Sequence, residues 1–174
     1  MENRDNDRAL RPRNFEEFLG QEEAKKNLST FVRAARARRE PLDHILMTGQ
    51  PGLGKTSLAN VISNEMGARI MVINAPTVKV KGDLARILVG LEKGDILFID
   101  EIHSLRLDIE EILYTAMEDY RIDMATPSGA VSITISPFTL IGATTRAGDL
   151  SQPLRDRFGE VISMQPYSTQ ELAL

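Results

Sequence analysis

The chain has 174 residues, 42% of them apolar, and a formal net charge of −4, which predicts one globular domain and argues against a broad nucleic-acid-binding face. It contains no cysteine, which excludes disulfides and thiolate metal sites, and its two histidines lie too far apart in sequence to suggest zinc, so magnesium is the metal that stays open. No apolar run approaches the ~20 residues of a membrane span and the N-terminal residues lack a secretory signal, so we expect a cytosolic protein.

Composition divides the chain into three parts. Residues 1–13 hold four arginines among polar residues, which predicts a flexible tail. Residues 14–167 have the pattern of a folded domain. Ser168 and Glu171 have the spacing of a capping box, which predicts a helix starting there. Because residues 168–174 are too few for a helix that is stable by itself, we expect them to begin a further, truncated domain.

Apolar periodicity then gives the elements in chain order. It predicts a helix at 21–39, a strand at 44–48, a helix ending before Gly67, a strand at 69–73, a helix at 83–91 with Asp83 near its cap, a strand at 95–100 and a helix at 108–120. A period-two pattern around Ser128 and Gly129 predicts a hairpin over 121–137. A strand at 138–143, a short helix at 153–157 and a strand at 161–164 follow. Strands that alternate with helices predict a mainly parallel sheet covered on both faces.

A glycine-rich loop follows the first predicted strand. Its sequence, GQPGLGKT at 49–56, fits the phosphate-binding pattern GxxxxGK[ST] and lies between a strand and a helix, as that pattern requires. Backbone N–H groups in such a loop cradle phosphates, the lysine reaches the β- and γ-phosphates, and the threonine hydroxyl binds Mg²⁺. The sequence therefore predicts an ATP or ADP site whose ligands include Gly49, Pro51, Gly52, Leu53, Gly54, Lys55, Thr56 and Ser57.

Two acids end the buried strand at 95–100. Four apolar residues precede Asp100 and Glu101, and buried strands seldom end in paired carboxylates without a role for them. Beside a phosphate-binding loop, Asp100 is placed to hold Mg²⁺, and Glu101 to polarise the attacking water as a general base. The alternative is an acidic pair that caps the next helix.

Further motifs make the chain resemble one family of AAA+ ATPases, the RuvB family of Holliday-junction branch-migration motors. These motifs are DEIH at 100–103, EEILY at 110–114, AMED at 116–119, FTLIGATTR at 138–146 and PLRDRFG at 153–159. The opening LRP at 10–12 and LDH at 42–44 are similar to the same family. The resemblance implies the AAA+ large domain, an α/β P-loop NTPase fold. Its five parallel strands would have the order 5-1-4-3-2, with a β-hairpin before the fourth strand.

The same resemblance implies positions around the nucleotide. Leu10 and Arg11 would lie against the purine. Glu118, Asp119, Tyr120 and Tyr167 match positions that line the nucleotide, although the two tyrosines can equally be ordinary core or edge aromatics.

It also implies two catalytic roles. Thr144 or Thr145 would be the sensor that reads the γ-phosphate, with Thr145 favoured, and either can instead be an ordinary strand residue. Arg157 would be the arginine finger that acts in a neighbouring subunit, with Arg155 as the alternative.

The implied assembly is a hexameric ring that works with a RuvA-like junction-binding protein, which docks on the hairpin, and with a RuvC-like resolvase. Four-way DNA would be contacted mainly through a C-terminal winged helix, which in that family would follow Leu174. Two alternatives stay open from the sequence. One is a truncated nucleotide-binding module without sustained turnover, and the other is a different AAA+ machine such as a clamp-loader subunit.

Overall fold

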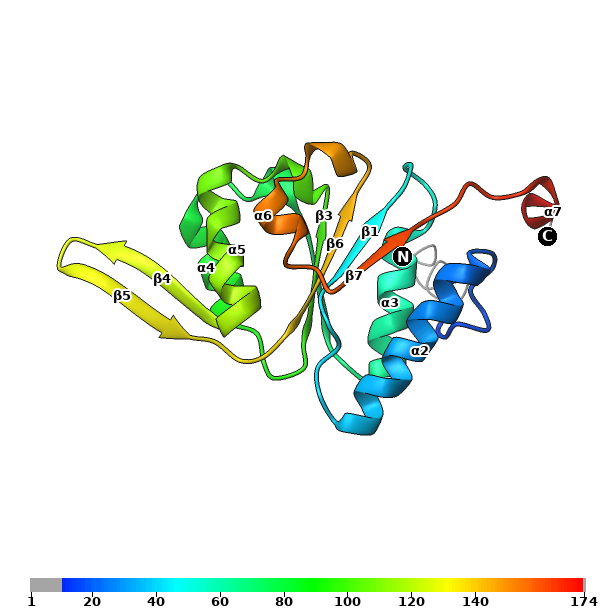
Figure 1. Ribbon diagram of the computed structural model, residues 1–174, viewed down its shortest axis with the longest axis horizontal. Coiled ribbons are helices and arrows are strands. Elements are labelled where there is room, and N and C mark those ends of the chain that lie inside the picture. Colours follow the sequence, from blue (N-terminus) through cyan, green and yellow to red (C-terminus); the bar gives the residue numbers. More distant parts are fainter. Residues whose placement is uncertain (1–10, 174) are drawn as a thin grey trace, which may run out of the picture.

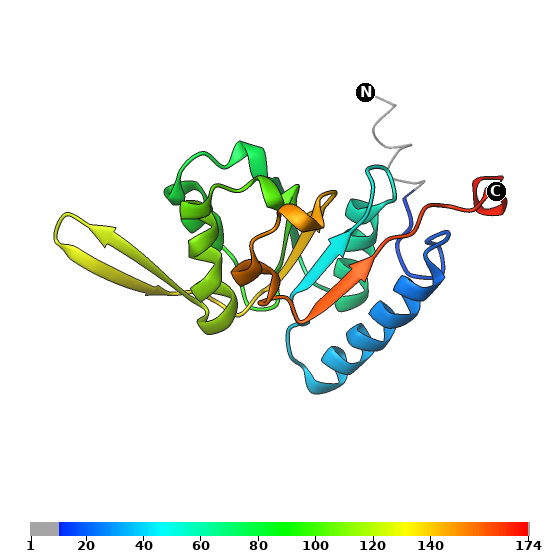
Figure 2. The ribbon, with the colours of Figure 1, turned by 45° about the horizontal axis from the view of Figure 1, so that its top comes forward.

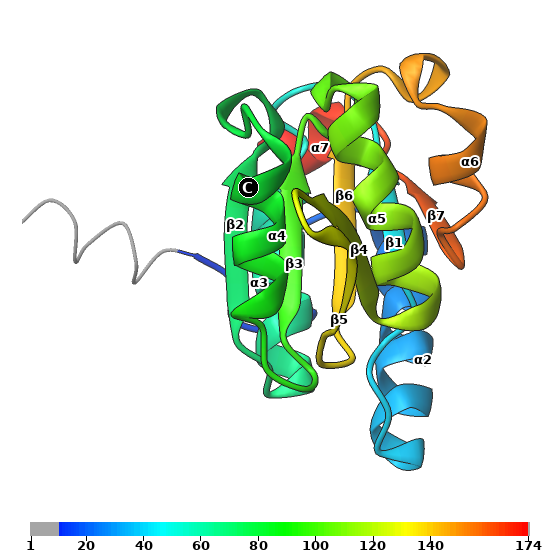
Figure 3. The same cartoon turned by 90° about the vertical axis from the view of Figure 1, so that its left-hand side faces the viewer.

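The computed structural model describes residues 11–173 and consists of a five-stranded parallel sheet, a separate hairpin and flanking helices (Figure 1). The sheet has the order β2-β3-β6-β1-β7, visible across Figure 3. Its strands are β1 (Ile45–Thr48), β2 (Ile70–Asn74), β3 (Ile96–Asp100), β6 (Thr139–Thr144) and β7 (Glu160–Ser163). Numbered within the sheet alone, these strands have the predicted order 5-1-4-3-2, so the fold prediction is confirmed.

Helices cover both faces of this sheet. In Figures 1 and 2, α2 (Glu22–Arg38) and α3 (Lys55–Met66) lie on one face. The other face carries α4 (Lys81–Val89), α5 (Leu107–Asp119) and the short α6 (Gln152–Arg155). The predicted stop at Gly67 is confirmed, because this residue adopts φ 62° and closes α3. Asp83 accepts hydrogen bonds from the backbone N–H groups of Lys79 and Val80 at 3.1 Å each, as expected of a residue at the helix start.

The central strands separate two apolar cores. Along β3, Leu97 and Ile99 pack with α4 and α5, whereas Ile96 and Phe98 pack with α2 and α3. This division follows from the alternation of side chains along a strand. A strand that is apolar at every position is therefore buried on both faces, which explains why the sequence pattern was continuous and not alternating.

The hairpin leaves the body of the domain. It is formed by β4 (Arg121–Thr126) and β5 (Gly129–Thr134), and it projects away from the sheet beyond α5 (Figure 1). Ile122 and Ile135 are buried at its base, while most residues toward its tip are exposed. The chain thus anchors the hairpin at one end and presents its tip to the surroundings.

At the other end of the chain, α7 (Thr169–Leu172) follows an extended segment after β7 (Figure 2). Ser168 and Glu171 form the predicted capping box, with the Ser168 N–H donating to Glu171 Oε2 at 2.7 Å. Residues 1–10 of the predicted tail lie outside the described residues. Between residues 11 and 173, no helix is long and apolar enough to cross a membrane.

Candidate nucleotide-binding site

The candidate site lies at the edge of the sheet where the parallel strands end. The glycine-rich loop follows β1, Asp100 is the last residue of β3, and Thr144 is the last residue of β6. Thr48 pairs with Thr144 across β1 and β6, and Ile99 pairs with Gly142 across β3 and β6. The sequence motifs that were far apart along the chain therefore meet at three neighbouring strand ends, where open α/β sheets bind their ligands.

Two glycines let the loop take its shape. Gly49 has φ 146°, and a Cβ there would lie 3.0 Å from Met164 Cβ, so a side chain would collide with the strand exit of β7. Gly54 has φ 90° immediately before α3, and a Cβ there would meet the Phe18 ring at 3.2 Å. The loop consequently turns directly into the N-terminus of α3, where the first N–H groups have no intrahelical acceptor and favour an anion.

Lys55 is held inside this loop. Its side chain is buried, and Nζ donates to the carbonyl oxygens of Gly49 at 2.7 Å and Gln50 at 2.9 Å. Burial lowers the pKa of Lys55, and the negative charges of Asp100 and Glu101 act in the opposite direction. The two carboxylates are thus close enough to act electrically on the ammonium group. Thr56 is exposed at the start of α3 and Ser57 is half-buried beside it.

The backbone turns sharply after β3 to place Glu101. This residue has φ 52°, a left-handed conformation that is uncommon outside glycine, and its N–H donates to Asp100 Oδ1 at 3.0 Å. The short helix η2 (Ile102–Ser104) follows at once. Such backbone conformations concentrate at functional sites, where they aim a side chain that a regular strand would direct elsewhere.

The two candidate sensor threonines have different surroundings. Thr145 donates from Oγ1 to Glu101 Oε2 at 3.4 Å, whereas the fully buried Thr144 accepts from the Arg146 N–H at 2.9 Å. Thr144 Oγ1 also lies 2.7 Å from Nδ1 of His103, whose Nε2 is 3.2 Å from Glu101 Oε2. His103 is a site residue that sequence reasoning missed, and its place directly after the acidic pair was the available signal.

Tyr167 reaches the loop from the segment after β7. Its hydroxyl donates to the Leu53 carbonyl oxygen at 3.1 Å, and its ring packs so closely on Gly20 that a Cβ there would lie 2.6 Å away. Nearby, the Gln21 side chain bonds both backbone groups of Gln165, donating at 2.6 Å and accepting at 2.9 Å. Neither glutamine was predicted to have a role, because the contact joins positions 144 residues apart.

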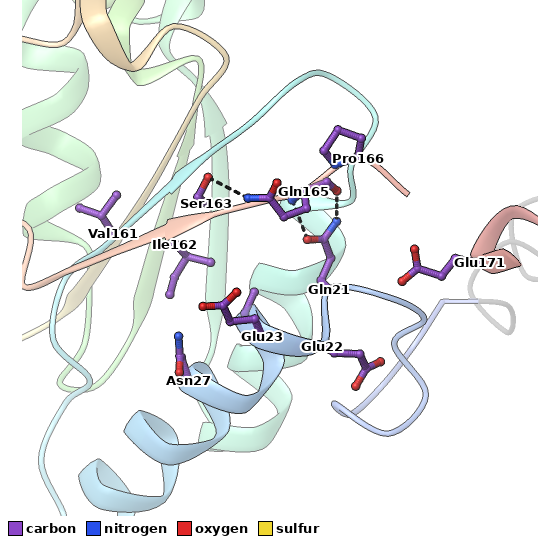
Figure 4. A pocket seen from close by; sticks show the side chains of 11 residues that line it. Gln21, Glu22, Glu23, Asn27, Val161, Ile162, Ser163, Gln165, Pro166 and Glu171 are labelled. Atoms are coloured by element: carbon purple, nitrogen blue, oxygen red, sulfur yellow. Dashed lines mark hydrogen bonds between the residues drawn. The ribbon is translucent and has the colours of Figure 1, made fainter. Parts of the chain in front are cut away.

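A pocket of about 350 Å³ lies beside the phosphate loop and not in it (Figure 4). It is bounded by the start of α2 and by β7 with the segment that follows it, and Figure 4 shows the carboxylates of Glu22, Glu23 and Glu171 around it. Three carboxylates make this pocket unsuited to a polyphosphate. The candidate nucleotide site is therefore assigned from the loop geometry.

The N-terminal segment, residues 11–20, docks on the last turn of α3, at the end of the helix away from the loop. The carbonyl of Arg13 accepts from Asn64 Nδ2 at 3.1 Å, and the N–H of Phe15 donates to Glu65 Oε1 at 3.2 Å. Arg11 is exposed at the first described position, and Leu10 lies outside the described residues. The predicted contact of these two residues with a purine stays a prediction.

The candidate arginine fingers do not join the loop of their own chain. Arg157, which follows α6, packs its side chain against α5, with Nε 3.3 Å from Glu118 Oε1 and its guanidinium 4.4 Å from the centre of the Tyr114 ring. Arg155 donates to the Ala147 carbonyl, and its buried Nε has no partner among the described residues. Both arginines lie on the sheet face opposite α3.

The segment 118–120 is also remote from the loop of its own chain. Tyr120 closes α5 and packs edge-on against Phe138, 6.1 Å between ring centres, just before β6 begins. That is the sheet edge opposite the strand ends that carry Asp100. The structure therefore brings Tyr167, but not Glu118, Asp119 or Tyr120, to the nucleotide loop within one chain. Helix α5 runs from one edge of the sheet to the other, so its last residues lie far from Asp100 and Glu101.

The oxygen donors at the strand ends fit Mg²⁺. Thr56 offers a hydroxyl and Asp100 a carboxylate, which are ligands that this ion accepts together with phosphate oxygens and water. Among the described residues, no group of three or more His, Cys, Asp and Glu side chains gathers to hold a metal alone. The residues present therefore suit an ion that is bound jointly with a phosphate.

Comparison with known proteins agrees with this geometry. The family model of the Holliday junction DNA helicase RuvB P-loop domain matches residues 10–164. The RuvB branch migration complex subunits of Campylobacter fetus and Campylobacter jejuni are 57% identical over 168 residues and 58% identical over 170 residues. These matches cover 94% and 95% of this chain but 49% and 51% of the relatives, so the chain spans about half of their length.

Solved structures give the same result. The Thermotoga maritima RuvB Holliday junction branch migration motor superposes with a TM-score of 0.84 at 49% identity, and a single-residue variant of it with 0.87 at 51%. Each covers 94% of this chain and about half of the matched chain, 51% and 52% respectively. NtrX from Brucella abortus in complex with ADP, at 18% identity and a TM-score of 0.62, shares the fold alone. On the family model, the relatives and the superposed motor together, the chain belongs to the RuvB family and contains its P-loop domain.

Proposed function

We propose that this chain is the ATP-hydrolysing part of a ring-forming motor that drives branch migration of Holliday junctions. The observation that carries the proposal is that the loop holding Lys55 follows β1, that Asp100 and Glu101 follow β3, and that these parallel strands end at one edge of the sheet on either side of β6. A loop that only connects a strand to a helix has no need of this charge arrangement. The relatives are subunits of a Holliday junction branch migration complex, and this supplies the substrate class of the proposal.

Each residue at the strand ends has a role in this proposal. The N–H groups at the start of α3 bind phosphate oxygens, and Lys55 exchanges its bonds to the Gly49 and Gln50 carbonyls for bonds to phosphate. Thr56 and Asp100 hold Mg²⁺, which supplies neutralisation of phosphate charge when bound. Glu101 accepts a proton from the attacking water.

Thr145 is the favoured sensor in this proposal. The Thr145 hydroxyl makes one long hydrogen bond, to Glu101. The Thr144 hydroxyl instead bonds both His103 and the Arg146 N–H. A side chain that reads the γ-phosphate must have a hydroxyl free to turn toward it. The different surroundings of the two threonines support the choice of Thr145 on that ground.

Arg157 acts in this proposal on the site of a neighbouring subunit. It lies on the α5 face of its own chain, beside Glu118, and is only 21% exposed there. A guanidinium so placed reaches a transferring phosphoryl group only across a subunit boundary. An arginine finger of this kind raises the rate by ~10³- to 10⁵-fold in related phosphoryl-transfer enzymes. Glu118, Asp119 and Tyr120, on the same side of the chain, face the neighbouring nucleotide in this arrangement.

The wider assembly follows the family. The ring is a hexamer, a RuvA-like protein binds the projecting hairpin, and a RuvC-like resolvase acts on the same junction. Four-way DNA is contacted mainly through a C-terminal winged helix. The exposed hairpin, which projects clear of the domain body, supports the docking role assigned to it (Figure 1).

Phosphate release with and without four-way DNA tests the proposal. Glu101→Gln should bind ATP as the wild type does and release no phosphate above background. Equal turnover of the two proteins would defeat the general-base assignment. Junction-stimulated turnover by residues 1–174 alone would exclude the alternative of a nucleotide-binding module without sustained turnover.

A further inference from the structure

We propose that His103 and Thr144 are positioning residues that orient the Glu101 carboxylate through one neutral tautomer of the histidine ring. This inference rests on the proposed function, in which Glu101 is the general base. It adds two residues that the phosphate-binding and acidic motifs do not include.

The proton positions follow from counting donors and acceptors. The ionised Glu101 carboxylate can only accept, so the neutral His103 ring carries its hydrogen on Nε2; Nδ1 then accepts the proton of Thr144 Oγ1, 2.7 Å away, while Oγ1 accepts from the Arg146 N–H at 2.9 Å. An Nδ1 that accepts this proton belongs to the neutral ring whose hydrogen is on Nε2. That N–H then points at Glu101 Oε2, 3.2 Å away, and donates to it. The four groups form one chain in which each hydrogen has a single acceptor.

Burial keeps this chain of hydrogen bonds in place. Thr144 is fully buried at the end of β6, and the His103 side chain is only 10% exposed, whereas that of Glu101 is 34% exposed. The inner members are therefore shielded from water, and the carboxylate at the end of the chain still reaches it. This is the arrangement expected of a base that must be both oriented and accessible.

Packing under η2 fixes the histidine backbone. A Cβ on Gly142 would lie 3.0 Å from Ile102 Cδ1, so the missing side chain of β6 creates the space that Ile102 fills. Ile102 is fully buried there and precedes His103 directly. The ring is thus held from the backbone side by apolar packing and from the other side by Thr144.

Glu101 itself needs such support. Its backbone is in the left-handed region, and its only other side-chain bond among the described residues is a long one from Thr145 at 3.4 Å. Without the Nε2–H donor, the carboxylate would sample rotamers that do not face the phosphate loop. Because small displacements of a reacting group can lower a rate ~100-fold, loss of this contact should appear in kcat.

The test compares substitutions that keep or move the donor. His103→Gln places an amide N–H near the position of Nε2, whereas His103→Asn places it near Nδ1, out of reach of Glu101. We expect His103→Asn and His103→Ala to lower kcat by ~10- to 100-fold with unchanged nucleotide Kd and unchanged thermal unfolding, and His103→Gln to keep most of the activity.

A second pair tests the tautomer. Thr144→Val removes the hydroxyl that donates to Nδ1 of His103 and should lower kcat. Thr144→Ser keeps a hydroxyl at this position and should have a kcat close to that of the wild type. The double variant Thr144→Val/His103→Ala should lose no more kcat than His103→Ala alone, since both residues act through the one contact with Glu101. Additive losses would show that the two residues act separately and would overturn the relay.

Glu101→Gln, measured in the same assay, separates this inference from the proposed function. If Glu101→Gln is inactive while His103→Asn and His103→Gln both turn over like the wild type, the relay is wrong and the general base stands. If Glu101→Gln turns over normally, both claims fall. A loss in His103→Asn that His103→Gln does not share supports the relay.

Discussion

The hydroxyl of Tyr167 donates a hydrogen bond to the carbonyl oxygen of Leu53, 3.1 Å away, and so ties the segment after β7 to the phosphate-binding loop. The ring of the same tyrosine covers Gly20. The Tyr167 side chain therefore joins three segments: the N-terminal segment at Gly20, the phosphate-binding loop at Leu53 and the segment after β7. A change at Tyr167 should be felt by the nucleotide through the shape of the loop.

Tyr167→Phe tests this connection. It removes the hydroxyl and leaves the packing on Gly20, so we expect nucleotide affinity to fall roughly 2- to 10-fold, as for the loss of one neutral hydrogen bond of about 0.5–1.5 kcal/mol. Titration with a fluorescent ADP analogue measures the affinity, and the unfolding midpoint checks the fold. Unchanged affinity in a normally folded variant would remove Tyr167 from the site.

Gly142→Ala tests the packing beneath η2. The added methyl group would lie 3.0 Å from both Ile102 and Phe158, so the variant should lose ~1–3 kcal/mol of unfolding free energy and should hydrolyse ATP more slowly. Gly82→Ala is the matched control, since a Cβ there meets nothing within 4 Å in α4. It should gain about 0.5–1 kcal/mol by helix propensity. Denaturant unfolding that ranks the two variants equally would contradict the packing argument.

His44 gives the stability a pH dependence. Burial lowers its pKa below 6.5, although the Met117 carbonyl and Asp43 act in the opposite direction. Nδ1 accepts from the Leu140 N–H at 2.8 Å, and Nε2 lies 3.0 Å from the Met117 carbonyl, so the neutral ring fits and a protonated one does not. As the pH falls, His44 is protonated at a higher pH in the unfolded chain than in the folded one. The free energy of unfolding should therefore be at its full value above pH 6.5 and decrease as the pH drops below it.

Unfolding measured between pH 7 and pH 5 tests that sign. The carboxyl groups of Asp123 and Glu171, whose pKa values are lowered, contribute at more acid pH and leave this window clear. His44→Gln should be less stable than the wild type at pH 7 and show a flatter dependence on pH. A wild-type slope that persists in His44→Gln would assign the effect to another group.

Arg157→Ala tests action across the subunit boundary. The variant should bind nucleotide normally, because Arg157 lies with Glu118 and Tyr114 and not at the loop of its own chain, and it should lose ~10³-fold or more of its hydrolysis. Mixing it with Lys55→Ala should restore part of the turnover, since mixed rings contain sites with both an intact loop and an intact finger. A mixture as inactive as its parts would remove support for a finger in trans, and Arg155→Ala run in parallel tests the alternative.

Sequence alone was sufficient for the parts of the site that are local. The phosphate loop, the acidic strand end and the alternation of strands and helices each depend on residues within one short segment, and the sheet order followed from the family resemblance. The parallel arrangement then places Lys55 and Asp100 at the same edge, because every strand ends there. The structure confirms the alternation and the sheet order, while the roles of the loop and of the acidic pair in binding and hydrolysis stay predictions.

Contacts between distant segments could not be predicted. His103 meets Thr144 41 residues later, and Gln21 meets Gln165 144 residues later, and no pattern in either segment indicates the other. The remote position of Tyr120 has a simpler cause, since the thirteen residues of α5 carry it to the opposite edge. The motif that precedes Tyr120 indicated the family, but it could not indicate where in the fold Tyr120 lies.

The central claim is that a triphosphate binds at the loop between β1 and α3 with Lys55 as its cationic ligand. Equilibrium titration of the wild type and of Lys55→Ala with ATP and Mg²⁺ tests it most directly. The account predicts saturable binding by the wild type and a loss of at least ~100-fold in affinity in a variant that unfolds as the wild type does. Equal affinity of the two proteins would contradict the account.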